Sequence, residues 1–458
     1  MKLRGGYNIL LKGRPNSEEE VLCDPEILYL PLQSPRFNFS ELCVEDGQQV
    51  AQGQILAKDP DNFFVPLLAP RVGTVRLQSV ESHIVLENIE QKSEEAIADS
   101  KEISVQEKSA ESKRKKLLDY GAWQFFYDAF EQSLPDPAKA PQAIILSILR
   151  LEPFGINGDA IVQNNLPDFI AGLEKLQSLI EYQPVYLVMP DTKSELTRYV
   201  REKIKGKAWV EFMEVPLRYP FDNFTVLARS LGLKRGTENP VWGIRAEGLL
   251  AVNKVLSNSQ PYTERIISFA GPGVKIPKHL KTVPGYPIDQ LISDRVTCEE
   301  TRVINGGILT GETVTKKTKG IDSECSRFTV LCEHTEREFM GFAMPGFGKH
   351  SYSNSFMSLV RRKFRENITT DLRGEQRPCV ACGFCEEVCP AGIMPHFIHK
   401  LLYQNELEEV EKHRIDLCVG CGLCSFVCPS KLELGKQFSD AHDLIREELH
   451  PQSSEPEE

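Results

Sequence analysis

The 458-residue sequence lacks any long hydrophobic run and any dense cluster of basic residues. Its densest apolar stretch, residues 143–149, has the length of a strand, whereas a membrane-spanning helix needs roughly 18 apolar residues. The formal net charge is −11, and no stretch interleaves Lys or Arg with aromatic side chains as nucleic-acid-binding surfaces do. The N-terminus shows neither the apolar core nor the cleavage pattern of a signal peptide. We therefore expect no membrane span, no nucleic-acid partner and no secretion signal.

A glycine-rich phosphate loop is also missing. No Gly-x-Gly-x-x-Gly follows an expected strand. In the nearest lookalike, residues 343–350, Ala343 replaces the first glycine and His350 replaces the Ser or Thr that would bind magnesium. The sequence therefore offers no motif for NAD or another nucleotide.

Glycines punctuate the first 90 residues, with Gly47, Gly53 and Gly73 between short apolar segments. This pattern is typical of tight turns between half-buried strands, and it resembles the barrel-sandwich of lipoyl and biotinyl carriers. A carrier lysine sits at a hairpin tip between characteristic neighbours, which Lys58 lacks. We therefore predict a structural module in which Lys58 carries no prosthetic group.

The middle of the chain alternates strands with amphipathic helices. Apolar runs at residues 143–149, 185–189 and 209–215 predict buried strands, and helical periodicity covers residues 169–180 and 196–204. This βαβ rhythm favours a mostly parallel, Rossmann-like sheet. The charge-dense residues before it indicate a solvated linker, and the strand-rich residues after it resemble the ubiquitin-like SLBB module.

The chain has 13 cysteines, and eight of them follow one spacing rule twice. The two copies are Cys379-x-x-Cys382-x-x-Cys385-x-x-x-Cys389-Pro390 and Cys418-x-x-Cys421-x-x-Cys424-x-x-x-Cys428-Pro429. This is the bacterial ferredoxin spacing for two [4Fe–4S] clusters, in which the last cysteine of each copy ligates the other cluster. The predicted metal ligands are therefore Cys379, Cys382, Cys385 and Cys428 for one cluster, and Cys389, Cys418, Cys421 and Cys424 for the other.

A zinc site is the main alternative for these cysteines, but zinc needs only two Cys-x-x-Cys pairs and no Cys-Pro. We interpret Cys298, Cys325 and Cys332 as small buried hydrophobic residues. His396 and His399 fit surface or capping roles better than a proton path. The basic run at residues 361–365 is compatible with a solvated helix face, a partner subunit or anionic lipid.

The order of short motifs along the chain resembles the NqrA family of the Na+-translocating NADH:quinone reductase. The matching segments are Gly5-Gly6-Tyr7-Asn8-Ile9, Gly47, Gly53, Ala69-Pro70, Gly73, Ser268-Phe269-Ala270-Gly271-Pro272, Leu309-Thr310-Gly311, Gly341-Phe342-Ala343-Met344-Pro345-Gly346, Ser355-Phe356 and Ser425-Phe426-Val427-Cys428-Pro429-Ser430-Lys431. Members of that family keep only a remnant of the ferredoxin region and carry no cluster. The complete cysteine motifs are instead similar to the C subunit of the Rnf complex, whose glycine-rich FMN/NADH loop is absent from residues 117–265. The Arg-Pro-Phe-Ser block of the NqrA family is also absent.

The resemblance implies a multidomain α+β and α/β protein. The expected parts are a lipoyl-like barrel-sandwich (1–90), a charged linker (91–116), a Rossmann-like α/β domain (117–260), an SLBB-like domain (261–332), connecting strands and a helix near 355–365 (333–370), a helical dicluster ferredoxin domain (371–450) and a disordered tail (451–458).

The implied function is electron relay through two [4Fe–4S] clusters toward quinone, as a peripheral subunit on the cytoplasmic side of the bacterial inner membrane. The implied partners are the other subunits of an Nqr- or Rnf-like complex, with membrane contact only through them and with quinone as a further ligand. No catalytic residue and no FMN or NAD site is expected. The alternatives are an Rnf-like subunit that accepts electrons from ferredoxin or NADH, and a structural adaptor.

Overall fold

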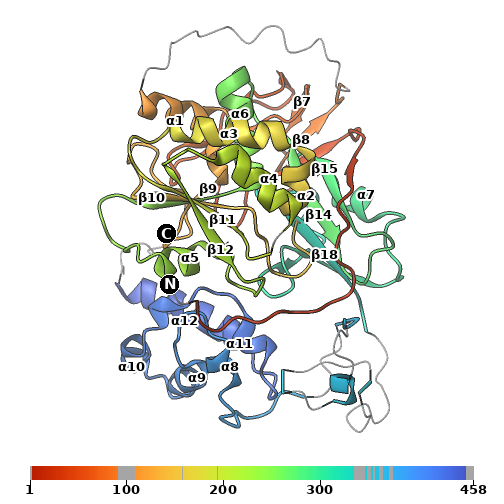
Figure 1. The fold of residues 1–458 in the computed structure, drawn as a ribbon. Coiled ribbons are helices and arrows are strands. Elements are labelled where there is room, and N and C mark those ends of the chain that lie inside the picture. Colours follow the sequence, from red (N-terminus) through yellow and green to blue (C-terminus); the bar gives the residue numbers. More distant parts are fainter. Residues whose placement is uncertain are drawn as a thin grey trace.

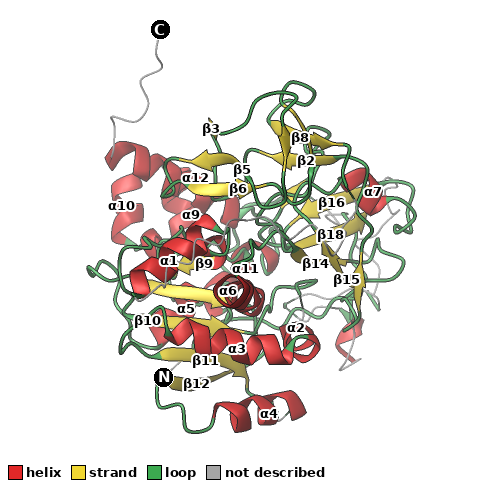
Figure 2. Ribbon diagram, turned by 90° about the horizontal axis from the view of Figure 1, so that it is seen from above, coloured by secondary structure: helices red, strands yellow, loops and turns green. Residues whose placement is uncertain are grey.

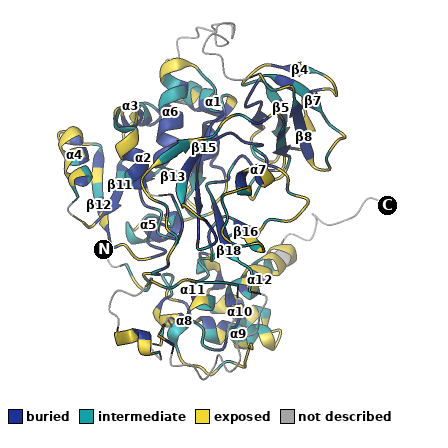
Figure 3. Cartoon of the chain, turned by 90° about the vertical axis from the view of Figure 1, so that its right-hand side faces the viewer, coloured by how far each residue is buried: buried dark blue, intermediate teal, exposed yellow. Residues whose placement is uncertain are grey.

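The computed structural model describes residues 3–90, 109–156, 158–192, 194–334, 346–347, 352–353, 356–360, 365–370 and 375–449. Three strand-containing regions lie together, and the helices of the last region gather at one end of the molecule (Figure 1). Buried residues concentrate in the central strands, whereas exposed residues follow the outer faces of helices such as α4 and α9 (Figure 3). No helix among the described residues is long and apolar enough to cross a membrane.

Two small antiparallel sheets form the first region. One has the order β2(Leu28–Pro31)–β8(His83–Glu87)–β7(Gly73–Arg76)–β4(Gln49–Val50), and the other β3(Glu41–Leu42)–β5(Ile55–Asp59)–β6(Val65–Leu68). Both contribute fully buried side chains, such as Leu30 and Leu56, to one core. Lys58 lies inside β5 opposite Pro66, and therefore not at the turn that joins β5 to β6.

A five-stranded sheet forms the α/β domain. Its order is β12(Val210–Val215)–β11(Val185–Pro190)–β10(Ala143–Ser147)–β13(Val241–Arg245)–β9(Phe126–Asp128), and only the edge strand β9 is antiparallel. The predicted parallel βαβ arrangement is confirmed for this region.

The helices of this domain are α1(Ala110–Asp119), η1(Trp123–Phe125), α2(Gly158–Asn164), α3(Leu166–Gln177), α4(Glu195–Ile204), α5(Phe224–Ser230) and α6(Ala246–Asn258). Figure 2 shows α1, α3 and α6 lying over the sheet. Helices α3 and α6 approach closely because Gly172 has no side chain; a Cβ there would lie 2.5 Å from the Leu249 carbonyl oxygen. Helix α1 begins within the predicted linker, capped by Ser109, and residues 91–108 lie outside the described part.

A six-stranded mixed sheet follows, with the order β1(Glu19–Val21)–β15(Lys278–Thr282)–β14(Arg265–Ala270)–β18(Arg327–Cys332)–β16(Thr301–Asn305)–β17(Glu312–Thr313), beside helix α7(Ile288–Ile292). Strand β1 comes from the N-terminal 90 residues, yet it pairs in parallel with β15. The first 90 residues therefore contribute strands to three sheets, and one of these sheets consists otherwise of later parts of the chain.

The interpretation of Cys298 and Cys332 as unpaired buried residues is wrong, because the two form a disulfide with Cα atoms 5.7 Å apart. The antiparallel pairing of β16 with β18 sets Thr301 opposite Cys332, which brings the preceding loop with Cys298 alongside. Cys325 is free and buried, as predicted.

The C-terminal region consists of short helices: α8(Phe384–Glu387), α9(Pro395–Tyr403), α10(Leu407–Lys412), η4(Ile415–Leu417), α11(Leu423–Phe426) and α12(Leu434–Leu449). Helices α9 and α10 are separate elements, because Asn405 adopts a left-handed conformation (φ 58°) between them. Of the helix expected near residues 355–365, the described part contains the 3-10 helix η3(Met357–Val360). Most of the phosphate-loop lookalike and of the basic run lies outside the described residues, as does the tail.

Candidate metal centres

Four cysteines from both motifs line one small cavity in the C-terminal region. They are Cys379, Cys382, Cys385 and Cys428, and the other lining residues are Val380, Gly383, His396, Pro429, Ser430, Leu432 and Leu434. The last cysteine of the second motif thus joins the first three of the first motif. This is the crossed grouping that the paired spacing predicts.

The remaining four cysteines form a second group. Burial raises the pKa of Cys418, and the nearby Cys389 raises it further. Burial raises the pKa of Cys421 to about 12, and Cys418 and Cys389 add to the rise. The pKa of Cys424 is raised well above its usual value by burial and then by the same three thiols. Cys389, Cys418, Cys421 and Cys424 therefore lie close enough to repel one another as thiolates.

The two loops share a local backbone design. In each loop an amide two residues after the first cysteine points at its sulfur, with Ala381 N 3.4 Å from Cys379 Sγ and Gly420 N 3.5 Å from Cys418 Sγ. Gly383 and Gly422 then adopt left-handed conformations, with φ of 79° and 70°, directly before α8 and α11. Glycine adopts this conformation without the strain that other residues meet there.

Four thiols around one cavity match the ligand set of a cubane cluster. No three His, Cys, Asp or Glu side chains in the described ranges converge closely enough to hold one metal ion. A cubane spreads its four thiolate ligands around a cluster of irons, so ligands arranged around a cavity fit it. Burial also raises the pKa of Cys385 to about 11. Metal ligation requires the thiolate, so iron would have to supply the charge that stabilises it.

The second cysteine group lies against the α/β domain and the six-stranded sheet. The buried Tyr219 hydroxyl donates to the Cys421 carbonyl oxygen (2.8 Å), and Arg229 Nη1 donates to the Leu417 carbonyl oxygen (2.7 Å). A Cβ on Gly422 would lie 2.7 Å from the Leu309 carbonyl oxygen. Sequence reasoning missed these contacts, since neither Tyr219 nor Arg229 belongs to a local motif.

Glu152 fixes the loop that packs on Gly422. Its carboxylate accepts hydrogen bonds from Leu309 N (2.9 Å), Thr310 N (3.1 Å) and Thr310 Oγ1 (2.9 Å). It also lies 3.2 Å from Arg327 Nη1. One buried carboxylate from the α/β domain thus secures the loop on which the second cysteine group rests.

The two histidines have packing roles. His399 Nδ1 hydrogen-bonds Gln437 Oε1 (2.7 Å) and ties α9 to α12. His396 lines the first cysteine cavity, with Nδ1 3.8 Å from Glu386 Oε2. Both side chains are half-buried rather than on the surface.

These observations define a multidomain α/β protein that ends in a ferredoxin-type cysteine domain, and comparison with known proteins agrees. Residues 108–259 match the family model "NqrA second alpha/beta domain", residues 266–316 match "NQRA C-terminal domain", an SLBB domain, and residues 378–432 match "4Fe-4S dicluster domain". The last match implies two iron–sulfur clusters. The chain is therefore similar to NqrA proteins along most of its length and carries, in addition, a match to a dicluster domain.

Its relatives include NqrA proteins of the Na(+)-translocating NADH-quinone reductase. The one from Psychromonas ingrahamii is 27% identical over 89% of this chain and 90% of the relative. The one from Vibrio parahaemolyticus is 28% identical over 77% of this chain and 78% of the relative. The match to a crystal structure of an NAD+-reducing [NiFe]-hydrogenase covers 77% of this chain and 70% of the hydrogenase chain, at 13% sequence identity and a TM-score of 0.42. This similarity is too distant to support an argument.

Proposed function

We propose that this protein is an electron-carrying subunit of a Na+-translocating NADH:quinone reductase-like complex, in which two [4Fe–4S] clusters relay electrons toward quinone. The observation that carries the proposal is the cavity shared by Cys379, Cys382, Cys385 and Cys428. Such clusters supply one-electron chemistry, and the chain supplies their ligands, their burial and their hydrogen bonds. In this proposal the second cluster takes Cys389, Cys418, Cys421 and Cys424.

The surroundings of the two groups support different positions in the relay. Cys382 is exposed, and its neighbour Val380 has 66% of its surface exposed, so the first cluster would meet solvent or a partner. The second group lies against Tyr219 and Arg229 of the α/β domain. A partner protein would therefore exchange electrons at the first cluster, and the second would face the body of the protein.

The rest of the function follows from the relatives' names and the missing motifs. Because the chain has no NAD or FMN motif, electrons would enter and leave through other subunits of the complex or through quinone. Those subunits would hold the protein at the cytoplasmic side of the bacterial inner membrane. In the same proposal the ferredoxin domain covers residues 371–450, and the barrel-sandwich, Rossmann-like and SLBB-like domains precede it.

Anaerobic purification with iron and sulfide analysis, followed by EPR after dithionite reduction, tests the proposal. We expect about eight irons per chain and two interacting signals. Cys428→Ser and Cys382→Ser should weaken the same signal, whereas Cys389→Ser and Cys421→Ser should weaken the other. The exposed Cys43 lies outside both groups, so Cys43→Ser serves as the matched control and should lose no iron. Little iron after anaerobic reconstitution would refute the relay, and signals lost in uncrossed pairs would refute the ligand assignment.

A further inference from the structure

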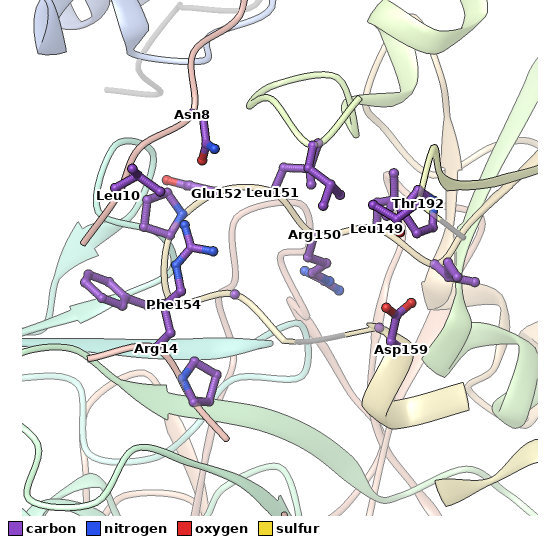
Figure 4. A pocket seen from close by; sticks show the side chains of 17 residues that line it. Asn8, Leu10, Arg14, Leu149, Arg150, Leu151, Glu152, Phe154, Asp159 and Thr192 are labelled. Carbon is purple, nitrogen blue, oxygen red and sulfur yellow. The ribbon is translucent and has the colours of Figure 1, made fainter. Parts of the chain in front are cut away.

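A cavity of about 370 Å³ opens where the parallel strands of the α/β domain end. Its walls come from the segment that follows β10, from Pro190 and Thr192 at the end of β11, and from Leu217 after β12. Residues 8–15 of the N-terminal segment close another side (Figure 4). Ligands of open α/β sheets bind outside the carboxyl ends of the strands, and a volume above about 300 Å³ is typical of small-molecule sites.

Two arginines of this cavity form no ion pair with any carboxylate in the described part of the chain. Arg14 donates to the Ile9 carbonyl oxygen (2.8 Å), Arg150 donates to Ser326 Oγ (2.9 Å), and neither pairs with a carboxylate among the described residues. Neighbouring positive charges also disfavour the charged form of Arg150. Its pKa falls to about 9, chiefly through burial and then through the positive charges of Arg245 and Arg327.

Of the carboxylates nearby, Glu247 offsets part of the charge of Arg150, although it also accepts a hydrogen bond from Ile266 N. Glu152 lines the cavity, but its carboxylate already accepts hydrogen bonds from Leu309 and Thr310 and pairs with Arg327. Arg245 lies 3.6 Å from Asp222. Burial raises the pKa of Asp159, which also lines the cavity. Arg14 and Arg150 are therefore two cations at one cavity, and neither forms an ion pair with a carboxylate of the described residues.

The backbone around the cavity is fixed. A Cβ on Gly158 would lie 1.6 Å from the Ile148 carbonyl oxygen, so only glycine allows this return of the chain after β10. On the opposite side, the Gly271 amide donates to the Gly13 carbonyl oxygen (2.9 Å), which pins the segment that carries Arg14. Between these points Leu149, Leu151 and Phe154 supply apolar wall. The cavity thus combines two anchored cations with an apolar surface.

We propose that this cavity binds a small organic phosphate, with Arg14 and Arg150 holding the phosphate group and the apolar wall holding the organic part. A phosphate monoester carries up to two negative charges, which matches two guanidinium groups better than one carboxylate does. The proposal does not depend on the iron–sulfur clusters.

Titration calorimetry on the full-length protein tests the proposal with matched probes: AMP against adenosine, and FMN against riboflavin. We expect at least one phosphorylated probe to bind with 1:1 stoichiometry and about tenfold or more tighter than its dephosphorylated partner. Inorganic phosphate should compete with it. FMN binding alone would also identify the organic part as a flavin.

Arg150→Gln and Arg14→Gln should each weaken that binding about tenfold or more. Arg14 is exposed, so its variant keeps the test informative should Arg150→Gln fail to fold. Arg201→Gln is the matched control, because Arg201 lies on α4, pairs with Glu214 and is not part of this cavity; it should leave binding unchanged. Equal binding of phosphorylated and dephosphorylated probes, binding unaffected by Arg14→Gln, or no saturable binding of either phosphate would overturn the proposal.

Discussion

Replacing Gly422 by alanine should weaken the contact between the second cysteine motif and the Leu309 loop, whereas the same change at Gly383 should leave that contact intact. The two glycines occupy the same position in the two cysteine motifs, and both have φ in the left-handed region, at 70° and 79°. That conformation alone costs an alanine about 1–2 kcal/mol at either site. Only at Gly422 would the added Cβ meet a neighbour, 2.7 Å from the Leu309 carbonyl oxygen; at Gly383 nothing lies within 4 Å.

The clash at Gly422 adds an overpacking cost of about 1–3 kcal/mol, because Glu152 holds the backbone of Leu309 and it cannot easily retreat. We expect Gly383→Ala to cost about 1–2 kcal/mol and Gly422→Ala about 2–5 kcal/mol. Urea unfolding of anaerobic protein, followed by the visible absorbance of the clusters, measures the difference. Amide hydrogen exchange at Leu309 should rise only in Gly422→Ala. Equal costs and unchanged exchange in both variants would show that this contact does not support the second cysteine group.

Three further changes probe other parts of the structure. Tyr219→Phe removes the hydrogen bond to the Cys421 carbonyl, so we expect a loss of about 1 kcal/mol and an altered reduction potential for one EPR signal only; equal shifts in both would contradict this. Burial lowers the pKa of His279, so the neutral histidine stabilises the fold above about pH 6.5, and this contribution is lost as the pH falls through the folded-state pKa. His279→Gln should therefore reduce the fall of the urea midpoint between neutral and acidic pH. An unchanged pH dependence of the urea midpoint would refute this role of His279. Burial alone would raise the pKa of Glu324, but Arg36 lowers it below its usual 4.5, so the pair should stabilise above about pH 4.5 and weaken at lower pH. Glu324→Gln should cost about 3–5 kcal/mol at neutral pH because it leaves Arg36 buried without its partner, and a cost below about 1 kcal/mol would count against the pair.

The sequence predicted those elements whose structure imposes a pattern on neighbouring residues. The strand at residues 143–147 is buried on both faces of a parallel sheet, and such a strand must be a continuous apolar run. The grouping of the cysteines could also be inferred from the sequence, because cluster geometry dictates ligand spacing within a few residues. In both cases the physical constraint acts over a stretch short enough to be visible in the sequence.

Pairings between segments that are distant along the chain could not be predicted from the sequence. Strand β1(Glu19–Val21) is only three residues long and has no buried residue, so nothing in its composition indicates that it pairs with residues 279–281. The disulfide between Cys298 and Cys332 depends on the register of β16 with β18, which spacing does not reveal. Tyr219 reaches a carbonyl some two hundred positions away, and a tyrosine with one such hydrogen bond looks like any other buried tyrosine in the sequence.

These distant contacts distinguish two motifs that the sequence makes equivalent. Reducing a cluster adds negative charge, and burial disfavours that charge, so the second cluster would be harder to reduce than the more exposed first one. Arg229 opposes this effect, since its guanidinium donates to the Leu417 carbonyl directly before Cys418 and would stabilise added charge there. The first group has a comparable donor, since Arg377 Nη2 donates to the Pro429 carbonyl directly after Cys428 (3.2 Å). The order of the two potentials would therefore depend on burial and on both arginines. Through Arg229, the α/β domain would contribute to the redox behaviour of the ferredoxin-type domain that follows it.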